Sequence, residues 1–251
     1  MKNKRNNELA VCGFAAVRAL EQHIEKISRL YFTADRAPAF GNLCRTLSQR
    51  KIPYNQVASP EELQKLCGSI HHQGAVAMIE APELGAVTGA ELSAWAAQKE
   101  KALFLDRIGN ANNFGAIVRS AAFFGFSRIV IPEDEQQAMI TTSAYRVAEG
   151  GMEQVSVYTV LSATAFLEGA RRWFVRVGSD ARGVVPVREA RKEIADNSFI
   201  LILGNEEDGL SFSVRRHCDI LAAIPSPAPE NNIDSLNVAQ AASVLMYELS
   251  L

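Results

Sequence analysis

Compact apolar runs alternate with amphipathic stretches over the second part of the chain, and this alternation limits the possible folds more than any other feature. Five runs suit buried strands: ALFLD (102–106), SRIVIP (127–132), WFVRV (173–177), SFILIL (198–203) and DILAAIP (219–225). Apolar residues at helical spacing lie between and after these runs, at 113–124, 142–148, 162–170, 188–195 and 236–249. Short apolar strands that alternate with helices predict an α/β domain whose mostly parallel sheet is covered on both faces.

The first part of the chain mixes helical and extended signals and predicts a smaller α/β domain. We expect helices at 11–22 and 38–50 and strands at 28–33 and 53–57. The segment 71–80 ends in a strand-like run. Ser59, Pro60 and two glutamates form a helix start, with a cap residue, a proline in the first turn and acids near the positive helix end.

Breaks at Ala81-Pro82 and Gly85 separate the two parts. We therefore expect a first domain at 1–85, a linker at 86–100 and a second domain at 101–251. Thr88 to Glu91 has the capping-box pattern, so the linker contains a helix start.

Composition narrows the class of protein. A formal net charge of −2 argues against a broadly basic nucleic-acid binder but leaves room for a local basic patch. Its candidates, which are equally readable as ordinary solvated charges, are Lys2, Lys4, Arg5, Arg45, Arg50 and Lys51. No apolar run approaches the roughly 18 residues of a membrane helix, and no signal-peptide pattern follows the N-terminus, so we expect a cytoplasmic protein without a membrane partner.

Neither cysteine nor histidine spacing indicates a metal site. The four cysteines, Cys12, Cys44, Cys67 and Cys218, form no C-x-x-C pair and suit neither a disulfide framework nor zinc, so we expect reduced thiols. For His71 and His72 we expect a role in the backbone turn beside Gly74.

Three polar loops follow predicted strands, where open α/β sheets bind ligands. They run from Asp106 to Arg119, from Leu203 to Leu210, and from Ile224-Pro225 to Ser235-Leu236-Asn237-Val238. Taken singly, each loop has a plain structural interpretation. Asparagines at 110, 112 and 113 suit turns and caps, the glycines at 204 and 209 suit a tight turn with a solvated acid, and Arg119 either extends to water or serves a site.

Together the three loops resemble, in order and spacing, the signature motifs of the SpoU/TrmH family of the SPOUT superfamily. The first motif is NFGAIVRSAAFFG (113–125), from Asn113 through Arg119 to Gly125. The second is Leu203 to Leu210, and the third joins Ile224-Pro225 to Ser235-Leu236-Asn237-Val238 and Glu248. More weakly, Gly13 to Leu20 and His72 to Ala77 resemble the L30e-like substrate-binding domain of members that act on ribosomal RNA.

The resemblance implies a C-terminal SPOUT domain with a deep trefoil knot, formed from about residue 198 onward, and methyl transfer from S-adenosylmethionine to a ribose 2′-hydroxyl of RNA. It implies catalytic roles for Asn113, Arg119, Glu206, Ser235 and Asn237, and cofactor contacts from Leu203, Gly204, Ile224 and Leu236. It also implies a homodimer that packs the knotted region and the terminal helix together.

Two alternatives to an rRNA methyltransferase follow from the same resemblance. One is a tRNA enzyme, although relatives that act on tRNA generally lack the L30e-like domain. The other is an RNA-binding relative without activity, which is favoured by Asn110-Ala111 in place of the family's Asp-Pro, by Ser226 after Ile-Pro and by a longer loop at 226–234.

Overall fold

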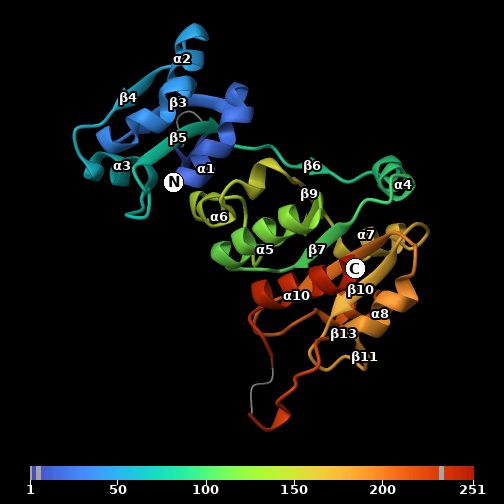
Figure 1. Ribbon diagram of the computed structural model, residues 1–251. Helices are drawn as coiled ribbons and strands as arrows, with labels where there is room; N and C mark the ends of the chain where they lie inside the picture. The colour runs from blue at the N-terminus through green and yellow to red at the C-terminus, as the bar shows by residue number, and fades with distance from the viewer. Residues whose placement is uncertain (1, 4–6, 232–234) are drawn as a thin grey trace. The chain divides into compact units, whose positions relative to one another are not determined.

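The computed structural model describes residues 2–3, 7–231 and 235–251 (Figure 1). Contacts between residues divide the chain into two units. The first unit comprises Met1–Glu83 and Ile140–Gln154, and the second comprises Leu84–Met139 and Val155–Leu251. The segment Ile140–Gln154 lies within the range expected for the second domain, yet its contacts group it with the first unit.

The first unit contains a five-stranded sheet in the order β1-β2-β5-β3-β4, in which only the β3–β4 pair is parallel. Its strands are β1 (Lys2–Asn3), β2 (Glu8–Cys12), β3 (Ile27–Phe32), β4 (Tyr54–Gln56) and β5 (Ala75–Glu80). Its α-helices are α1 (Phe14–Ala19), α2 (Gly41–Gln49), α3 (Pro60–Cys67) and α6 (Thr142–Ala148). Short 3-10 turns lie at Leu20–Gln22, Ile24–Lys26, Ala34–Phe40 and Gly151–Glu153.

The helix expected at 11–22 is wrong at its start. Val11 and Cys12 belong to β2 and pair with Ala77 and Val76 of β5, and α1 begins only at Phe14. The apolar residues that indicated a helix face are instead buried in a central strand. Gly13 separates the two elements with a φ of 103°, which an L-residue rarely adopts.

The second unit contains an eight-stranded sheet in the order β11-β13-β10-β12-β7-β8-β9-β6, and all its strand pairs are parallel. The strands are β6 (Gly85–Ala86), β7 (Ala102–Asp106), β8 (Arg128–Pro132), β9 (Ser156–Val160), β10 (Val175–Ser179), β11 (Val185–Pro186), β12 (Phe199–Gly204) and β13 (Ile220–Ala223). The helices are α4 (Gly89–Ala97), α5 (Ala111–Phe124), α7 (Ala163–Ala170), α8 (Val187–Ile194), α9 (Phe212–Arg215) and α10 (Val238–Ser250).

The predicted parallel sheet with two covered faces is confirmed. Phe104, Ile200 and Ile202 pack in a core cluster with residues of α4, α7 and α9. Their strand neighbours Leu103 and Leu201 point to the other face, because successive strand residues alternate, and both are fully buried. Helices α5 and α10 lie side by side, joined by a 2.8 Å hydrogen bond between the hydroxyls of Ser120 and Ser243 (Figure 1).

Strand β9 of this unit was not expected from the sequence, whereas the helix start predicted within the linker is confirmed. Strand β9 has the sequence SVYTV, whose polar residues interrupt the apolar run that would predict a buried strand. The segment expected as a linker contains α4, which begins with a complete capping box between Thr88 and Glu91 and buries Leu92 and Trp95 in the core. Over the described residues, no helix is long and apolar enough to cross a membrane.

Candidate active site

The three motif loops leave the sheet of the second unit at one edge. Strands β7 and β12 are adjacent and parallel, with Gly204 paired to Asp106 at their last residues. Strand β10 separates β12 from β13, which also runs parallel and is followed by Ile224. Parallel strands end on the same side of a sheet, so all three loops begin at the edge where open α/β sheets bind ligands.

Asn110 fixes the start of α5. Its side-chain oxygen accepts hydrogen bonds from the backbone N–H groups of Asn112 and Asn113, at 2.8 and 3.3 Å. This is an ordinary N-cap, and it satisfies two amides that the helix leaves without partners. The proline that the family has at 111 is therefore not needed to start the helix here, because the asparagine cap does this work.

One residue from each loop meets in a hydrogen-bonded group. The side-chain nitrogen of Asn113, Nδ2, donates to Oε1 of Glu206 at 2.9 Å. Nδ2 of Asn237 donates to Oδ1 of Asn113 at 3.3 Å, while Asn237 also caps α10 through the N–H of Ala239. The backbone N–H of Asn110 approaches the same Glu206 oxygen at 3.4 Å. Asn113 thus bonds two residues that lie 93 and 124 positions away from it in the sequence.

The second motif is a turn that folds back on the end of β12. Asn205 and Gly209 exchange two backbone hydrogen bonds of 3.0 Å, and Gly209 has a φ of 71°. A Cβ atom on Gly204 would lie 2.3 Å from both the carbonyl carbon of Gly209 and the nitrogen of Leu210. Both motif glycines are thus required by backbone geometry. The interpretation as a tight turn holds, but the acid at 206 serves the site as well.

The residues proposed to bind the cofactor differ in what they can offer. The side chain of Leu203 is fully buried in the core, so only its backbone is available to a ligand. Ile224 is half-buried directly after β13, and Leu236 is 47% exposed directly before the cap of α10. Ser235 is exposed. Apolar side chains left partly open beside strand ends can flank an aromatic ring, with backbone groups to recognise its edge.

Arg119 lies on a different side of α5 from Asn113. The two positions are six steps apart along the helix, which corresponds to a rotation of about 600° and an advance of about 9 Å. Arg119 is exposed, and it shares a helical stripe with Phe123, four residues further on, which is 82% exposed. Within one chain, the structure joins Asn113, Glu206 and Asn237 by hydrogen bonds, and Arg119 starts from another side of the same helix.

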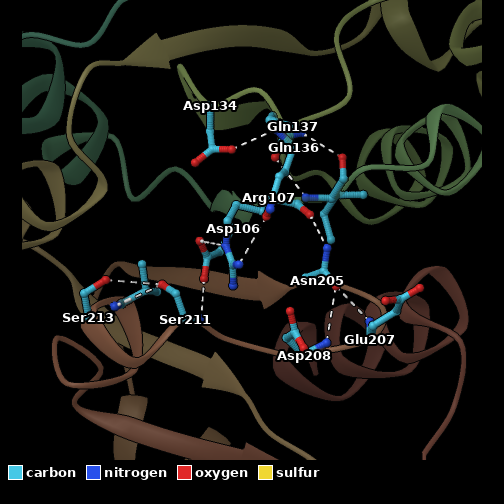
Figure 2. Close-up of polar contacts among 12 residues, drawn as sticks. Asp106, Arg107, Asp134, Gln136, Gln137, Asn205, Glu207, Asp208, Ser211 and Ser213 are labelled. Atoms are coloured by element: carbon cyan, nitrogen blue, oxygen red, sulfur yellow. Dashed lines mark hydrogen bonds and ion pairs between the residues drawn. The ribbon is translucent and has the colours of Figure 1, made fainter.

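A second polar group, around the ends of β7 and β12, was not found from the sequence (Figure 2). Asp106 is 2% exposed and accepts a hydrogen bond from the backbone N–H of Ser211 at 2.6 Å. Gln137 is 4% exposed and bonds both the N–H and the carbonyl of Ile108, at 3.0 and 3.2 Å. Buried polar groups next to motif loops were the missing signal, and burial is not readable from a single sequence.

The first unit holds the remaining candidates. His72 has the expected turn role, since its Nδ1 accepts the N–H of Gly74 at 3.1 Å. Arg50 and Lys51 are exposed, and Arg45 bonds the side chain of Asn42. Lys4 and Arg5 lie outside the described residues, as does part of the loop 226–234.

Two family models match the chain. The SpoU rRNA methylase family matches residues 100–247, and the RNA 2′-O ribose methyltransferase substrate-binding family matches residues 10–85. The 23S rRNA (guanosine-2′-O-)-methyltransferase RlmB of Xanthomonas campestris pv. campestris is 31% identical over 249 residues, which cover 97% of this chain and 96% of the relative. The protein of the same name from Nitrosomonas europaea is 28% identical over 95% of this chain and 89% of its own length.

Solved structures share the fold. The AdoMet-bound rRNA methyltransferase from Sinorhizobium meliloti has a TM-score of 0.77 at 20% identity, over 98% of this chain and 88% of that one. The SpoU methyltransferase AviRb from Streptomyces viridochromogenes has a TM-score of 0.73 at 22% identity, over 98% and 90%. Three findings agree: the motif loops converge in space, a family model matches most of the second unit, and a relative matches along nearly its whole length. The chain therefore belongs to the SpoU rRNA methylase family.

Proposed function

We propose that this chain transfers a methyl group from S-adenosylmethionine to the 2′-hydroxyl of a guanosine ribose in 23S ribosomal RNA. One observation carries the proposal. Asn113, Glu206 and Asn237 come from three separate motif loops, and Asn113 bonds both of the others at the edge of a parallel sheet. The relatives of nearly equal length are named for 23S rRNA, which favours ribosomal RNA over tRNA. Residues 10–85, which match the substrate-binding family, would hold the RNA.

The residues at this edge fit S-adenosylmethionine. Its sulfonium makes the transferred methyl group electrophilic, so no metal and no covalent protein intermediate are needed. Backbone groups of Leu203 and Gly204 would recognise the cofactor, and Ile224 and Leu236 would supply its apolar walls. These four positions lie at the carboxyl ends of β12 and β13 or directly before α10.

The chain's own residues then have to place the ribose and its hydroxyl in line with the methyl group. The planar guanidinium of Arg119 suits the oxygens of a phosphate, so Arg119 would hold the target phosphate instead of acting as the base. Glu206 holds the amide of Asn113. Ser235 would fix the third loop, and the proton of the hydroxyl would leave by way of the substrate phosphate.

A homodimer through α5 and α10 would complete the site. Phe123 is 82% exposed and Tyr247 is 51% exposed, and the ring of Phe124 lies 6.2 Å from that of Tyr247. An apolar surface on two packed helices is typical of an interface. Because Arg119 shares the stripe of Phe123, such a dimer would bring Arg119 to the junction of two copies. A trefoil knot formed from about residue 198 onward and a cytoplasmic location complete the proposal.

The test uses ribosomal RNA from a strain that lacks the gene, mixed with the purified protein and S-adenosylmethionine. We expect one new 2′-O-methylated guanosine, mapped by primer extension. Arg119→Ala should abolish transfer and leave cofactor binding, measured by calorimetry, within about threefold. Arg171→Ala, which removes an arginine that is exposed and lies at the end of α7, serves as the control and should keep full activity. Cofactor binding without transfer to any RNA would favour the inactive relative, and retained turnover in Arg119→Ala would refute the role of the arginine.

A further inference from the structure

The first and second motif loops are tied together by two side chains, one from each loop, and each bonds the backbone at or next to the other loop. The carboxylate of Asp106, at the end of β7, accepts the backbone N–H of Ser211 beyond the turn that follows β12 (Figure 2). Nδ2 of Asn205, directly after β12, donates to the backbone carbonyl of Arg107 at 2.9 Å. Since Gly204 pairs with Asp106 in the sheet, each strand end is bonded to the loop that follows the other strand.

Asn205 uses both halves of its side chain. Its Oδ1 accepts the N–H groups of Glu207 and Asp208 at 2.8 and 3.3 Å, which holds the turn in shape. Its Nδ2 fastens that turn to Arg107. Glu206 is the next residue, and its carboxylate holds Asn113. The direction of the Glu206 side chain therefore depends on how its neighbour is fixed.

The carbonyl that Asn205 binds is itself held firmly. Arg107 has a φ of 60°, a left-handed conformation that costs an L-residue about 1 kcal/mol and persists only where the surroundings enforce it. Its guanidinium lies 3.4 Å from Asp106 and 3.3 Å from the side-chain oxygen of Gln136. The buried amide of Gln137 fixes Ile108 on the other side. Asn205 thus attaches the turn to a rigid point.

We propose that Asn205 is a positioning residue for methyl transfer, which acts by tying the Glu206 turn to the carbonyl of Arg107 so that Glu206 can hold Asn113. The inference rests on the proposed function. It assigns to Asn205 a donor role that requires an amide and that a carboxylate of the same shape cannot fulfil.

The variant Asn205→Asp tests this role directly. It keeps the shape and the acceptor for the turn, but it puts an oxygen where the Arg107 carbonyl needs a donor. We expect kcat to fall by about 10- to 100-fold, the effect of a misplacement on the order of 1 Å, with the affinity for S-adenosylmethionine within about threefold.

Asn197→Asp is a matched control. Nδ2 of Asn197 also donates to a backbone carbonyl, that of Ile194 at 3.0 Å, but it lies before β12, at the opposite end of the strand from the site. We expect its kcat within about twofold of wild type. In a Glu206→Gln background, Asn205→Asp should add less than about threefold, because the two residues act as one unit.

Crystal structures of the wild type and of Asn205→Asp would show the contact between Glu206 and Asn113 directly, without an activity assay. The bond between Glu206 and Asn113 should be lost in the variant. A retained bond, an equal loss of kcat in Asn197→Asp, or full additivity with Glu206→Gln would each overturn the inference. A wild-type protein that methylates no RNA would instead refute the proposed function, and the two structures would still decide the role of Asn205.

Discussion

Among substitutions of glycine by alanine in the second unit, Gly204→Ala should damage the site most. The added Cβ would lie 2.3 Å from backbone atoms of Gly209 and Leu210. Carbon atoms pack at about 3.5 to 4.0 Å, so the turn would have to move by more than about 1 Å. Neither neighbour is a flexible side chain that could rotate away. We expect a loss of about 1 to 3 kcal/mol in the free energy of unfolding, and Glu206 would be displaced from Asn113.

Two assays separate stability from function in this variant. Thermal unfolding should show a Tm lowered by about 2 to 12 °C, and single-turnover methylation should slow by about 100-fold or more. Gly169→Ala is the control, because this glycine lies in α7 with nothing within 4 Å of the added carbon, and alanine there should raise stability by about 0.5 to 1 kcal/mol. A Gly204→Ala protein with wild-type Tm and wild-type turnover would refute the claim that the turn must contact the end of β12.

The other predictions concern stability and assembly. Burial would raise the pKa of Asp219, but hydrogen bonds from Arg176, which is 4% exposed, hold it below its ordinary value. Because the Asp219 side chain is 39% exposed, Asp219→Ala should cost on the order of 1 kcal/mol at pH 7. Urea unfolding should show the difference shrink as the pH falls below the ordinary range of a carboxyl and disappear only once the pH is below the lowered pKa of Asp219; a pH-independent difference would contradict this. Phe123→Asp should shift sedimentation from dimer to monomer and reduce methyl transfer without weakening cofactor binding, and an active monomer would refute the dimeric site.

Much of the fold could be predicted from the sequence because local patterns decide it. The runs at 102–106 and 198–203 became β7 and β12 within one residue, since buried parallel strands need continuous apolar sequence. The failures have the same origin. The segment around Val11 has helical spacing and yet forms a strand, because pairing with β5 overrides the local preference.

The sequence by itself determined the α/β class, most of the buried strands and the three motif loops, because hydrophobic periodicity and turn residues act over a few positions. Only the tertiary structure decided which loop residues meet. Asn113 bonds Glu206 and Asn237 across 93 and 124 residues, while Arg119, six residues further along α5, starts from another side of the helix. The order of strands in the sheet and the rotation of α5 set these relations, and neither is contained in spacing along the chain. The same holds for Asp106 and Asn205, whose roles come from burial and from the pairing of β7 with β12.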